Sequence, residues 1–252
     1  MDFLETILRE KQIEVAAMPL EAVQPLRQTY SFYDYIQKHP HQMQIIGEVK
    51  RASPSKGAIN LEVDVVTQAR SYEKAGVAAV SVLTDPYFFK GSIADLRAVA
   101  EKVAVPVLCK DFIIDSKQLI RARNAGATIV LLIVAALSTK QLASLYREAT
   151  DLGLEVLVEV HNQQELVCAH ELAACLIGVN NRNLKTFDVS LETSIALSQN
   201  HIAGNVYISE SGFTNVQQVA AICEKYQAIL VGESLMREGR PAEKVKELKV
   251  QR

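Results

Sequence analysis

The chain has 252 residues, with 27 Lys and Arg against 29 Asp and Glu, so its formal net charge is −2. This near balance argues against a dedicated nucleic-acid binder, which usually carries a basic excess or stripe. Hydrophobic residues make up 49% and charged residues 22%, a mixture typical of a globular protein with a full core and not of a disordered chain. At this length we expect two small domains or one large α/β domain.

The N-terminus and the cysteines predict a cytoplasmic protein. The first fifteen residues carry charges throughout, which indicates an amphipathic helix and not a secretory signal. The longest apolar stretch, residues 127–137, is shorter than the ~20 residues that cross a bilayer, so no membrane partner is expected. The cysteines show no CxxC spacing and are expected to be reduced thiols; they are Cys109, Cys168, Cys175 and Cys223.

From residue 43 onward, short β-branched apolar runs alternate with helical segments. The runs begin about 26 residues apart, the length of one βα unit, and no change in composition marks a linker. Several helical segments begin after Asp, Ser or Thr and end at Gly76, Gly126 or Gly153, where a left-handed residue ends a helix. The eight runs are residues 43–50, 78–84, 105–112, 127–134, 154–160, 175–181, 205–211 and 227–233, and the clearest helices are residues 63–76, 115–126, 138–153 and 214–226.

Eight βα units predict a closed (β/α)8 barrel, or TIM barrel, formed by a single domain over residues 1–252. A doubly wound open sheet is the competing fold, but it more often has about five to seven strands. Residues 1–40 precede the first strand, and we expect them to form an N-terminal helical extension of one or two helices packed against the barrel.

Polar side chains end five of the eight apolar runs. In a (β/α)8 barrel, chemistry occurs at the carboxyl ends of the strands, where the βα loops meet. A single such residue would be interpreted as a rim charge in a surface ion pair, which contributes ~0–1 kcal/mol. Their coincidence on five runs indicates an active site, and the residues are Glu48 and Lys50, Lys110, Glu159, Asn180 and Arg182, and Glu210 and Ser211.

The alternation of side chains along a strand sharpens this prediction. Glu48 and Lys50 share one face of their strand, and Lys110 shares a face with the apolar residues two positions before and after it. If these faces point into the barrel, two lysines and two glutamates converge at one mouth, whereas the direction of Glu210 is left open. We expect apolar neighbours to lower the pKa of Lys110, so that it acts as a general acid near neutral pH.

Two glycine-containing pairs suggest a phosphate site. Ser211-Gly212 follows the seventh run and Gly232-Glu233 follows the eighth, where many barrels bind phosphate with backbone N–H groups and a short helix. The loop at residues 51–64 is longer than a typical βα loop, and we interpret it as a lid.

Other ligand classes leave no signature. The sequence contains no GxGxxG or GxxxxGK[ST] motif, which disfavours a dinucleotide or a nucleoside triphosphate. The five histidines show no metal-ligand spacing, and only His161 lies near the end of a run. No metal site is expected.

Six segments resemble the indole-3-glycerol phosphate synthase family, and the similarity covers essentially the whole chain. They are GEVKRASPSKG at 47–57, VLCKDFIID at 107–115, EVLVEVHN at 155–162, IGVNNRNL at 177–184, SESG at 209–212 and VGESLM at 231–236. The resemblance implies a carbon–carbon lyase of tryptophan biosynthesis that converts 1-(2-carboxyphenylamino)-1-deoxyribulose 5-phosphate into indole-3-glycerol phosphate, carbon dioxide and water. It also implies a monomer that needs no cofactor or metal.

The resemblance assigns roles to matching residues. Lys110 would protonate the ribulose carbonyl oxygen, and Lys50 would contact the substrate carboxylate and assist ring closure or dehydration. Glu159, held with Asn180, would act on the hydroxyl that leaves as water, and Glu48 would position Lys50 or take a proton during rearomatisation. Glu210 and Ser211 complete the catalytic set. The phosphate cradle would be Ser53, Ser211, Gly212, Gly232 and Glu233; the apolar walls would be Phe89, Phe112, Leu131 and Leu184, with Arg182 as an active-site arginine.

Three other functions remain open at this point. The barrel is also compatible with a sugar-phosphate isomerase, with an aldolase that uses Lys110 to form a Schiff base, and with a catalytically silent module that binds a phosphorylated ligand. Borohydride trapping with substrate would distinguish the aldolase.

Overall fold

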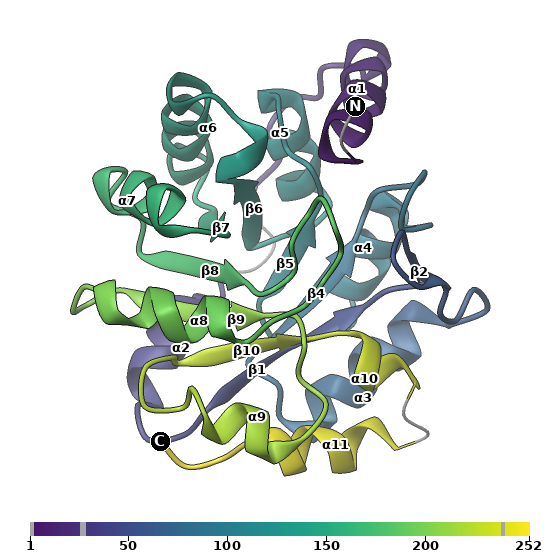
Figure 1. The fold of residues 1–252 in the computed structure, drawn as a ribbon. Helices are drawn as coiled ribbons and strands as arrows, with labels where there is room; N and C mark the ends of the chain where they lie inside the picture. Colours follow the sequence, from purple (N-terminus) through teal and green to yellow (C-terminus); the bar gives the residue numbers. More distant parts are fainter. Residues whose placement is uncertain (1–2, 26–28, 238–239) are drawn as a thin grey trace.

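The structure is a computed structural model that describes residues 3–25, 29–237 and 240–252. Eight parallel strands form a closed barrel in the order β1-β10-β9-β8-β7-β6-β5-β4, with β1 and β4 pairing to complete the circle (Figure 1). The predicted (β/α)8 barrel is confirmed and the open sheet is excluded. The strands are β1 Gln44–Val49, β4 Ala79–Leu83, β5 Val107–Lys110, β6 Ile129–Ile133, β7 Glu155–Val160, β8 Leu176–Asn180, β9 Val206–Glu210 and β10 Ala228–Val231.

Helices follow the strands and cover the outside of the barrel. Asp64 begins the first of them, because its side chain accepts a hydrogen bond from the Thr67 backbone N–H at 2.6 Å, and Gly76 ends it at φ 85°. Gly126 and Gly153 also have positive φ, as their positions predicted. The helices are α3 Val65–Ala75, α4 Ile93–Ala100, α5 Ser116–Asn124, α6 Thr139–Asp151, α7 Gln163–Glu171, α8 Glu192–Leu197, α9 Val216–Ala220, α10 Glu233–Arg237 and α11 Pro241–Leu248, with 3-10 turns η1 Val134–Ala136 and η2 Ser198–Asn200.

One local prediction is wrong. The helix expected over residues 214–226 ends at Ala220, because the following backbone forms turns in which Ile222 and Lys225 each bond to the residue three positions earlier. The long loop after β1 contains a small antiparallel hairpin of β2 Ala52–Ser53 and β3 Gly57–Ala58.

The core has two layers separated by the strands. Side chains of one parity fill the barrel, among them Ile46, Leu108, Leu157 and Ile208. The other parity packs against the helices, and it includes Cys109, which is 2% exposed and faces outward as predicted. All four cysteines are free.

The N-terminal extension, predicted to form one or two helices, contains α1 Phe3–Ala17 and α2 Phe32–Lys38. Helix α2 closes the amino-terminal end of the barrel, where Phe32 and Ile36 join the interior core. Glu155, the first residue of β7, fastens this helix by accepting hydrogen bonds from Ser31 Oγ at 2.8 Å and from the backbone N–H groups of Phe32 and Tyr33 at 2.7 and 2.9 Å. Helix α1 lies beside α5 near the opposite end.

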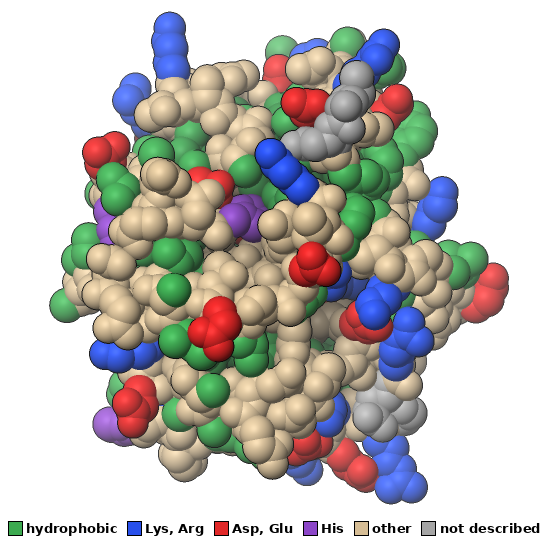
Figure 2. Space-filling view, in the orientation of Figure 1, with side chains coloured by type: hydrophobic (Ala, Val, Ile, Leu, Met, Phe, Trp, Pro, Cys, Tyr) green, Lys and Arg blue, Asp and Glu red, His purple; other side chains and the backbone are tan. Residues whose placement is uncertain are grey.

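The described surface carries charges of both signs. On the face in Figure 2, Lys and Arg side chains lie among Asp and Glu side chains and do not form separate areas of one sign. Within the described ranges, no helix is long and apolar enough to cross a membrane.

Candidate active site

A cavity of about 680 Å³ opens at the carboxyl ends of the strands. Every predicted site residue lines it except Ser53, which lines a smaller adjoining cavity of about 80 Å³ together with Lys50, Arg182 and Glu233. The lining residues predicted from the sequence are Glu48, Lys50, Phe89, Lys110, Phe112, Leu131, Glu159, Asn180, Arg182, Leu184, Glu210, Ser211, Gly212, Gly232 and Glu233.

Lys110 lies at the centre of the cavity between two carboxylates. Its Nζ donates to Oε2 of Glu159 at 2.8 Å and to Oε2 of Glu210 at 2.9 Å, and both glutamate side chains are 2% exposed. Glu210 therefore points into the barrel, with the same parity as Ile208, which settles the direction that the sequence left open. Gly178 on β8 makes this possible, because a Cβ at that position would fall on Oε1 of Glu210.

The expected lowering of the Lys110 pKa is wrong. Burial alone would lower it, but the negative charges of Glu159, Glu210 and Glu48 outweigh burial and raise the pKa of Lys110 above its ordinary value. Two carboxylates within hydrogen-bond distance stabilise the ammonium more than the apolar neighbours destabilise it. Lys110 is therefore fully charged in the free protein.

The two glutamates around Lys110 are not equivalent. Burial favours the neutral form of Glu159, yet Lys110 and His161 together hold its pKa below its ordinary range. Burial also favours the neutral form of Glu210, and the negative charges of Glu159 and Glu48 act in the same direction. Lys110 does not offset these effects together, so the pKa of Glu210 rises to about 7. One carboxylate is ionised at neutral pH while its neighbour titrates there.

His161 is a site residue that sequence reasoning missed. It directly follows β7, and its Nε2 lies 3.2 Å from Oε1 of Glu159, while Asn180 Nδ2 donates to the same oxygen at 3.2 Å. Its position after a strand end was a usable signal, but the absence of metal-ligand spacing led us to set the histidines aside.

Glu48 and Lys50 form a second pair at the end of β1. Lys50 Nζ donates to Oε1 of Glu48 at 2.5 Å, and the side chains are 17% and 6% exposed respectively. Gly232 follows β10 and faces this pair. A Cβ at this position would overlap Glu48 Oε1 and lie 3.1 Å from Lys50 Nζ. The glycine thus makes room for this pair as well as lining the predicted phosphate end.

Asn180 connects the catalytic set to the neighbouring loops. Its Oδ1 accepts hydrogen bonds from the Arg182 backbone N–H and from Ser211 Oγ, both at 3.0 Å. Arg182 Nη1 in turn donates to Ser55 Oγ at 3.1 Å and joins the loop after β8 to the predicted lid. The amide orientation of Asn180 is therefore determined on both of its polar atoms.

The predicted phosphate end lies where β9 and β10 finish. Ser211 and Gly212 both have positive φ, at 70° and 97°, and α10 begins at Glu233 immediately after Gly232. The Glu233 carboxylate pairs with Arg237 at 3.1 Å and lies 3.9 Å from Lys56 of the predicted lid.

The apolar wall of the cavity is built on two loops. The rings of Phe89 and Phe112 lie 6.1 Å apart between centroids. Their backbones are held by aspartates: Asp85 Oδ1 accepts from Phe89 N–H at 3.3 Å, and Asp111 Oδ1 accepts from Phe112 N–H at 2.8 Å.

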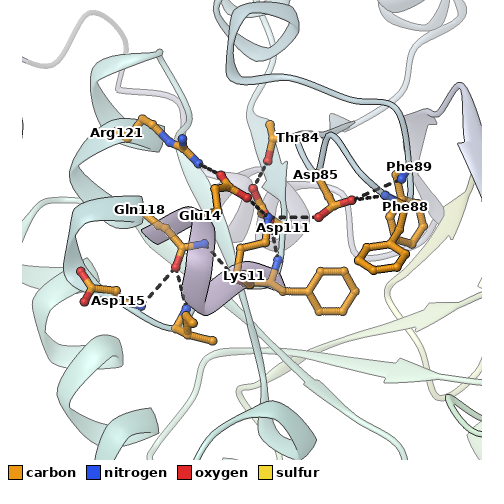
Figure 3. Close-up of polar contacts among 12 residues, drawn as sticks. Lys11, Glu14, Thr84, Asp85, Phe88, Phe89, Asp111, Asp115, Gln118 and Arg121 are labelled. Carbon is orange, nitrogen blue, oxygen red and sulfur yellow. Dashed lines mark hydrogen bonds and ion pairs between the residues drawn. The ribbon is translucent and has the colours of Figure 1, made fainter. Parts of the chain in front are cut away.

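Lys11 of α1 neutralises these aspartates (Figure 3). Its Nζ lies 2.8 Å from Asp111, 3.1 Å from Asp85 and 2.7 Å from Glu14, and the side chain is 1% exposed. Although burial opposes the charge, these carboxylates raise the pKa of Lys11 above its ordinary value. Arg121 also pairs with Glu14, at 2.9 Å. The N-terminal helix is thus joined by buried charge to the loops that carry the apolar wall.

In the part of the chain that the structure describes, no three His, Cys, Asp or Glu side chains are grouped so as to hold a metal ion. The described side chains of the site supply ammonium, guanidinium, carboxylate, imidazole, hydroxyl and amide groups.

The fold and site together define a (β/α)8-barrel enzyme whose charged cavity lies at the carboxyl ends of the strands. Solved barrels share the fold: a 3-hexulose-6-phosphate synthase has a TM-score of 0.66 at 15% identity, covering 82% of this chain and 98% of its own. The tryptophan synthase alpha subunit of Legionella pneumophila has a TM-score of 0.62 at 12% identity, covering 86% and 95%.

The chain belongs to the indole-3-glycerol phosphate synthase family, whose model matches residues 4–248. The indole-3-glycerol phosphate synthase of Listeria welshimeri is 60% identical over 252 residues, covering 100% of both chains. That of Streptococcus sanguinis is 55% identical over 249 residues, covering 99% of this chain and 98% of its own. These matches confirm the predicted family and its activity, that of a carboxy-lyase in tryptophan biosynthesis.

Proposed function

We propose that the cavity binds 1-(2-carboxyphenylamino)-1-deoxyribulose 5-phosphate and converts it into indole-3-glycerol phosphate, with loss of carbon dioxide and water. The observation that supports this most directly is the arrangement of Lys110 and Lys50 in one cavity, each paired with carboxylate. The substrate carries a phosphate at one end and a carboxylate at the other. A protein with net charge −2 must attract it with locally placed cations and backbone dipoles.

Lys110 is the general acid of the ring closure in this proposal. When the aromatic carbon attacks the ribulose carbonyl, negative charge develops on the carbonyl oxygen. A positioned ammonium in a water-poor cavity stabilises that charge and delivers a proton to it. Glu159 and Glu210 hold the ammonium in place until the carbonyl oxygen takes over one of its hydrogen bonds.

The remaining polar residues serve the later steps. Loss of the carboxylate restores electrons to the ring and releases carbon dioxide. Glu159, oriented by Asn180, acts on the hydroxyl that then leaves as water, because that hydroxyl derives from the oxygen beside Lys110. Lys50 contacts the substrate carboxylate, and Glu48 positions Lys50 or takes the proton whose loss rearomatises the product.

Substrate orientation follows from the two ends of the cavity. Backbone N–H groups around Ser211, Gly212, Gly232 and Glu233 would hold the phosphate, with Ser53 beside them. The aromatic end would lie against Phe89, Phe112, Leu131 and Leu184, with Arg182 near its carboxylate. This scheme uses no cofactor or metal, and we expect the protein to work as a cytoplasmic monomer.

The test is to mix the purified protein with this substrate and follow the rise of indole fluorescence. Lys110→Ala should abolish the rise, whereas the matched control Lys102→Ala, at an exposed surface lysine, should leave it unchanged. No rise in the parent protein, despite phosphate-dependent binding, would refute the proposal in favour of a silent barrel. Covalent trapping by borohydride with substrate would instead indicate a Schiff-base aldolase.

A further inference from the structure

The carboxylates of Glu159 and Glu210 are placed almost identically around Lys110, at 2.8 and 2.9 Å from Nζ. Both side chains are 2% exposed, so neither burial nor Lys110 distinguishes them. Their charged surroundings differ in two ways: an imidazole lies beside Glu159, and the negative charge of Glu48 acts on Glu210. When two acids share a site, the group that makes their environments unequal decides which one carries the proton.

We infer that His161 is a positioning residue that, as an imidazolium, keeps Glu159 ionised and leaves the proton of the carboxylate pair on Glu210. This inference rests on the proposed function, because it assigns proton states within that active site. His161 does not line the cavity, so it acts through Glu159 and not on the substrate.

Both ring nitrogens of His161 face carboxylate oxygens. Nδ1 lies within hydrogen-bond distance of Oε2 of Glu165 at 3.0 Å, and Nε2 lies 3.2 Å from Oε1 of Glu159 as an ion-pair contact without hydrogen-bond alignment. A neutral imidazole has only one N–H and would present a lone pair to one of these carboxylates, whereas an imidazolium presents a positively charged N–H edge to both. The side chain is 12% exposed, so water cannot readily substitute for either partner.

Glu165 is itself held in place for this contact. Its Oε2 also accepts from the His161 backbone N–H at 2.8 Å, and its Oε1 accepts from Asn162 Nδ2 at 2.6 Å. It lies in the first turn of α7, where the helix dipole favours a negative charge. The Glu165 carboxyl group is therefore fixed against the ring of His161.

The other groups near His161 agree with this assignment. Lys110 contacts the other oxygen of Glu159, Oε2, while the uncharged amide of Asn180 donates to the oxygen that His161 faces. The adjacent β6 and η1, IVLLI and VAA, carry no titratable residue. Burial alone would lower the pKa of His161, but Glu159 and Glu165 raise it to about 10. Glu159 has the opposite shift, with its pKa below its ordinary range, and of the two carboxylates it is Glu210 whose pKa rises to about 7.

The assignment gives each group a place in the proton balance. When Lys110 passes a proton to the substrate oxygen, Glu159 loses one neighbouring cation but retains His161, so it does not recapture that proton. Glu210 then transfers its own proton to Nζ and becomes a carboxylate, which restores the ammonium for dehydration. Oε2 of Glu210 lies 2.9 Å from Nζ, so a proton on this oxygen can pass directly to the amine, and among the described residues Oε1 of Glu210 is buried without a hydrogen-bond partner that would stabilise the ionised form.

The test compares His161→Asn with the parent in the fluorescence assay across pH. The acid limb of the kcat/KM profile should move up by about one pH unit, a roughly tenfold loss at its acid end, with little change near pH 8. His170→Asn is the matched control, because that histidine lies on α7, the helix that begins two residues after His161, but contacts Tyr207 Oη at 2.9 Å. Its profile should coincide with that of the parent.

A double-mutant cycle separates this role from a merely structural one. Loss of His161 should couple to both Glu159→Gln and Glu210→Gln, so that the paired effects on kcat are not multiplicative, because each glutamine removes one member of the carboxylate pair in which His161 places the proton. If His161→Asn does not fold, Glu165→Gln gives the same acid-limb shift by removing the anion that keeps His161 charged.

NMR titration of the His161 ring needs no substrate and should find it protonated at pH 8. An unshifted acid limb in His161→Asn, or a ring that is neutral at pH 7, would overturn the inference. An inactive parent protein with a protonated His161 would instead refute the proposed function while leaving the charge of His161 established.

Discussion

Replacing Lys11 by Met tests whether the N-terminal helix is held by buried charge. Methionine keeps the unbranched apolar stem and removes the ammonium that joins Asp85, Asp111 and Glu14. The Asp85 and Asp111 side chains are 1% and 3% exposed, so both would be left as buried anions without a cation.

The magnitude follows from that burial. Removing one partner of a buried ion pair costs about 3–5 kcal/mol, because the other charge remains desolvated. For a chain of this size, that loss corresponds to a fall in Tm of roughly 6–20 °C. If α1 detaches, water reaches the aspartates and the loss of unfolding free energy is smaller. A fall in Tm at the low end of this range should therefore be accompanied by faster hydrogen exchange in residues 3–17.

Chemical and thermal unfolding monitored by circular dichroism provide the assay. Arg240→Met is the matched control: it removes an equally short pair with Glu243, at 3.1 Å, whose side chains are 77% and 68% exposed. That variant should lose at most about 1 kcal/mol. The triple variant Lys11→Met, Asp85→Asn, Asp111→Asn should recover part of the loss, because it removes the unpaired anions.

The same variant should affect substrate binding more than turnover. Asp85 and Asp111 hold the backbones of Phe89 and Phe112, so their displacement should raise KM with a smaller change in kcat. A Lys11→Met protein that matches Arg240→Met in Tm and matches the parent in KM would refute this reasoning.

Three further predictions concern single positions. Gly178→Ala should lower kcat by roughly 10²-fold in steady-state assays while the protein still folds, because its Cβ would displace Glu210 from Lys110. The raised pKa of Glu210 stabilises the fold below about pH 4.5, and that contribution is lost as the pH rises through about 7. Urea titrations should therefore show the parent losing stability relative to Glu210→Gln over this interval, and parallel curves would contradict it. Glu155→Gln should weaken the attachment of α2 and lower the free energy of unfolding by about 1–3 kcal/mol with kcat unchanged, since Glu155 lies at the opposite end of the barrel from the cavity.

Features with a local cause were predictable from the chain. Eight apolar runs, helix-capping Asp64 and helix-ending Gly76 depend on near neighbours in sequence, and all recur in the structure. Because parallel strands in a closed barrel end at one mouth, polar residues at the run ends also identified the site before its geometry was known. Glu48, Lys110 and Asn180 all line the cavity as predicted.

Electrostatic interactions between residues that are distant in sequence could be identified only from the tertiary structure. Lys110 meets carboxylates 49 and 100 positions away, which reverses the pKa shift expected from its apolar neighbours in the chain. Lys11 lies on the buried face of α1 between Ile7 and Val15, but its partners Asp85 and Asp111 follow β4 and β5, so only the tertiary structure identifies them.

The sequence by itself determined the barrel, its extension and the set of residues at its mouth, because hydrophobic periodicity and capping act over a few residues. Only the tertiary structure decided which of those residues are charged, which way Glu210 points and that His161 contacts Glu159. Electrostatic interactions in a buried site depend on distances between side chains from different strands, and these distances exist only once the barrel has closed.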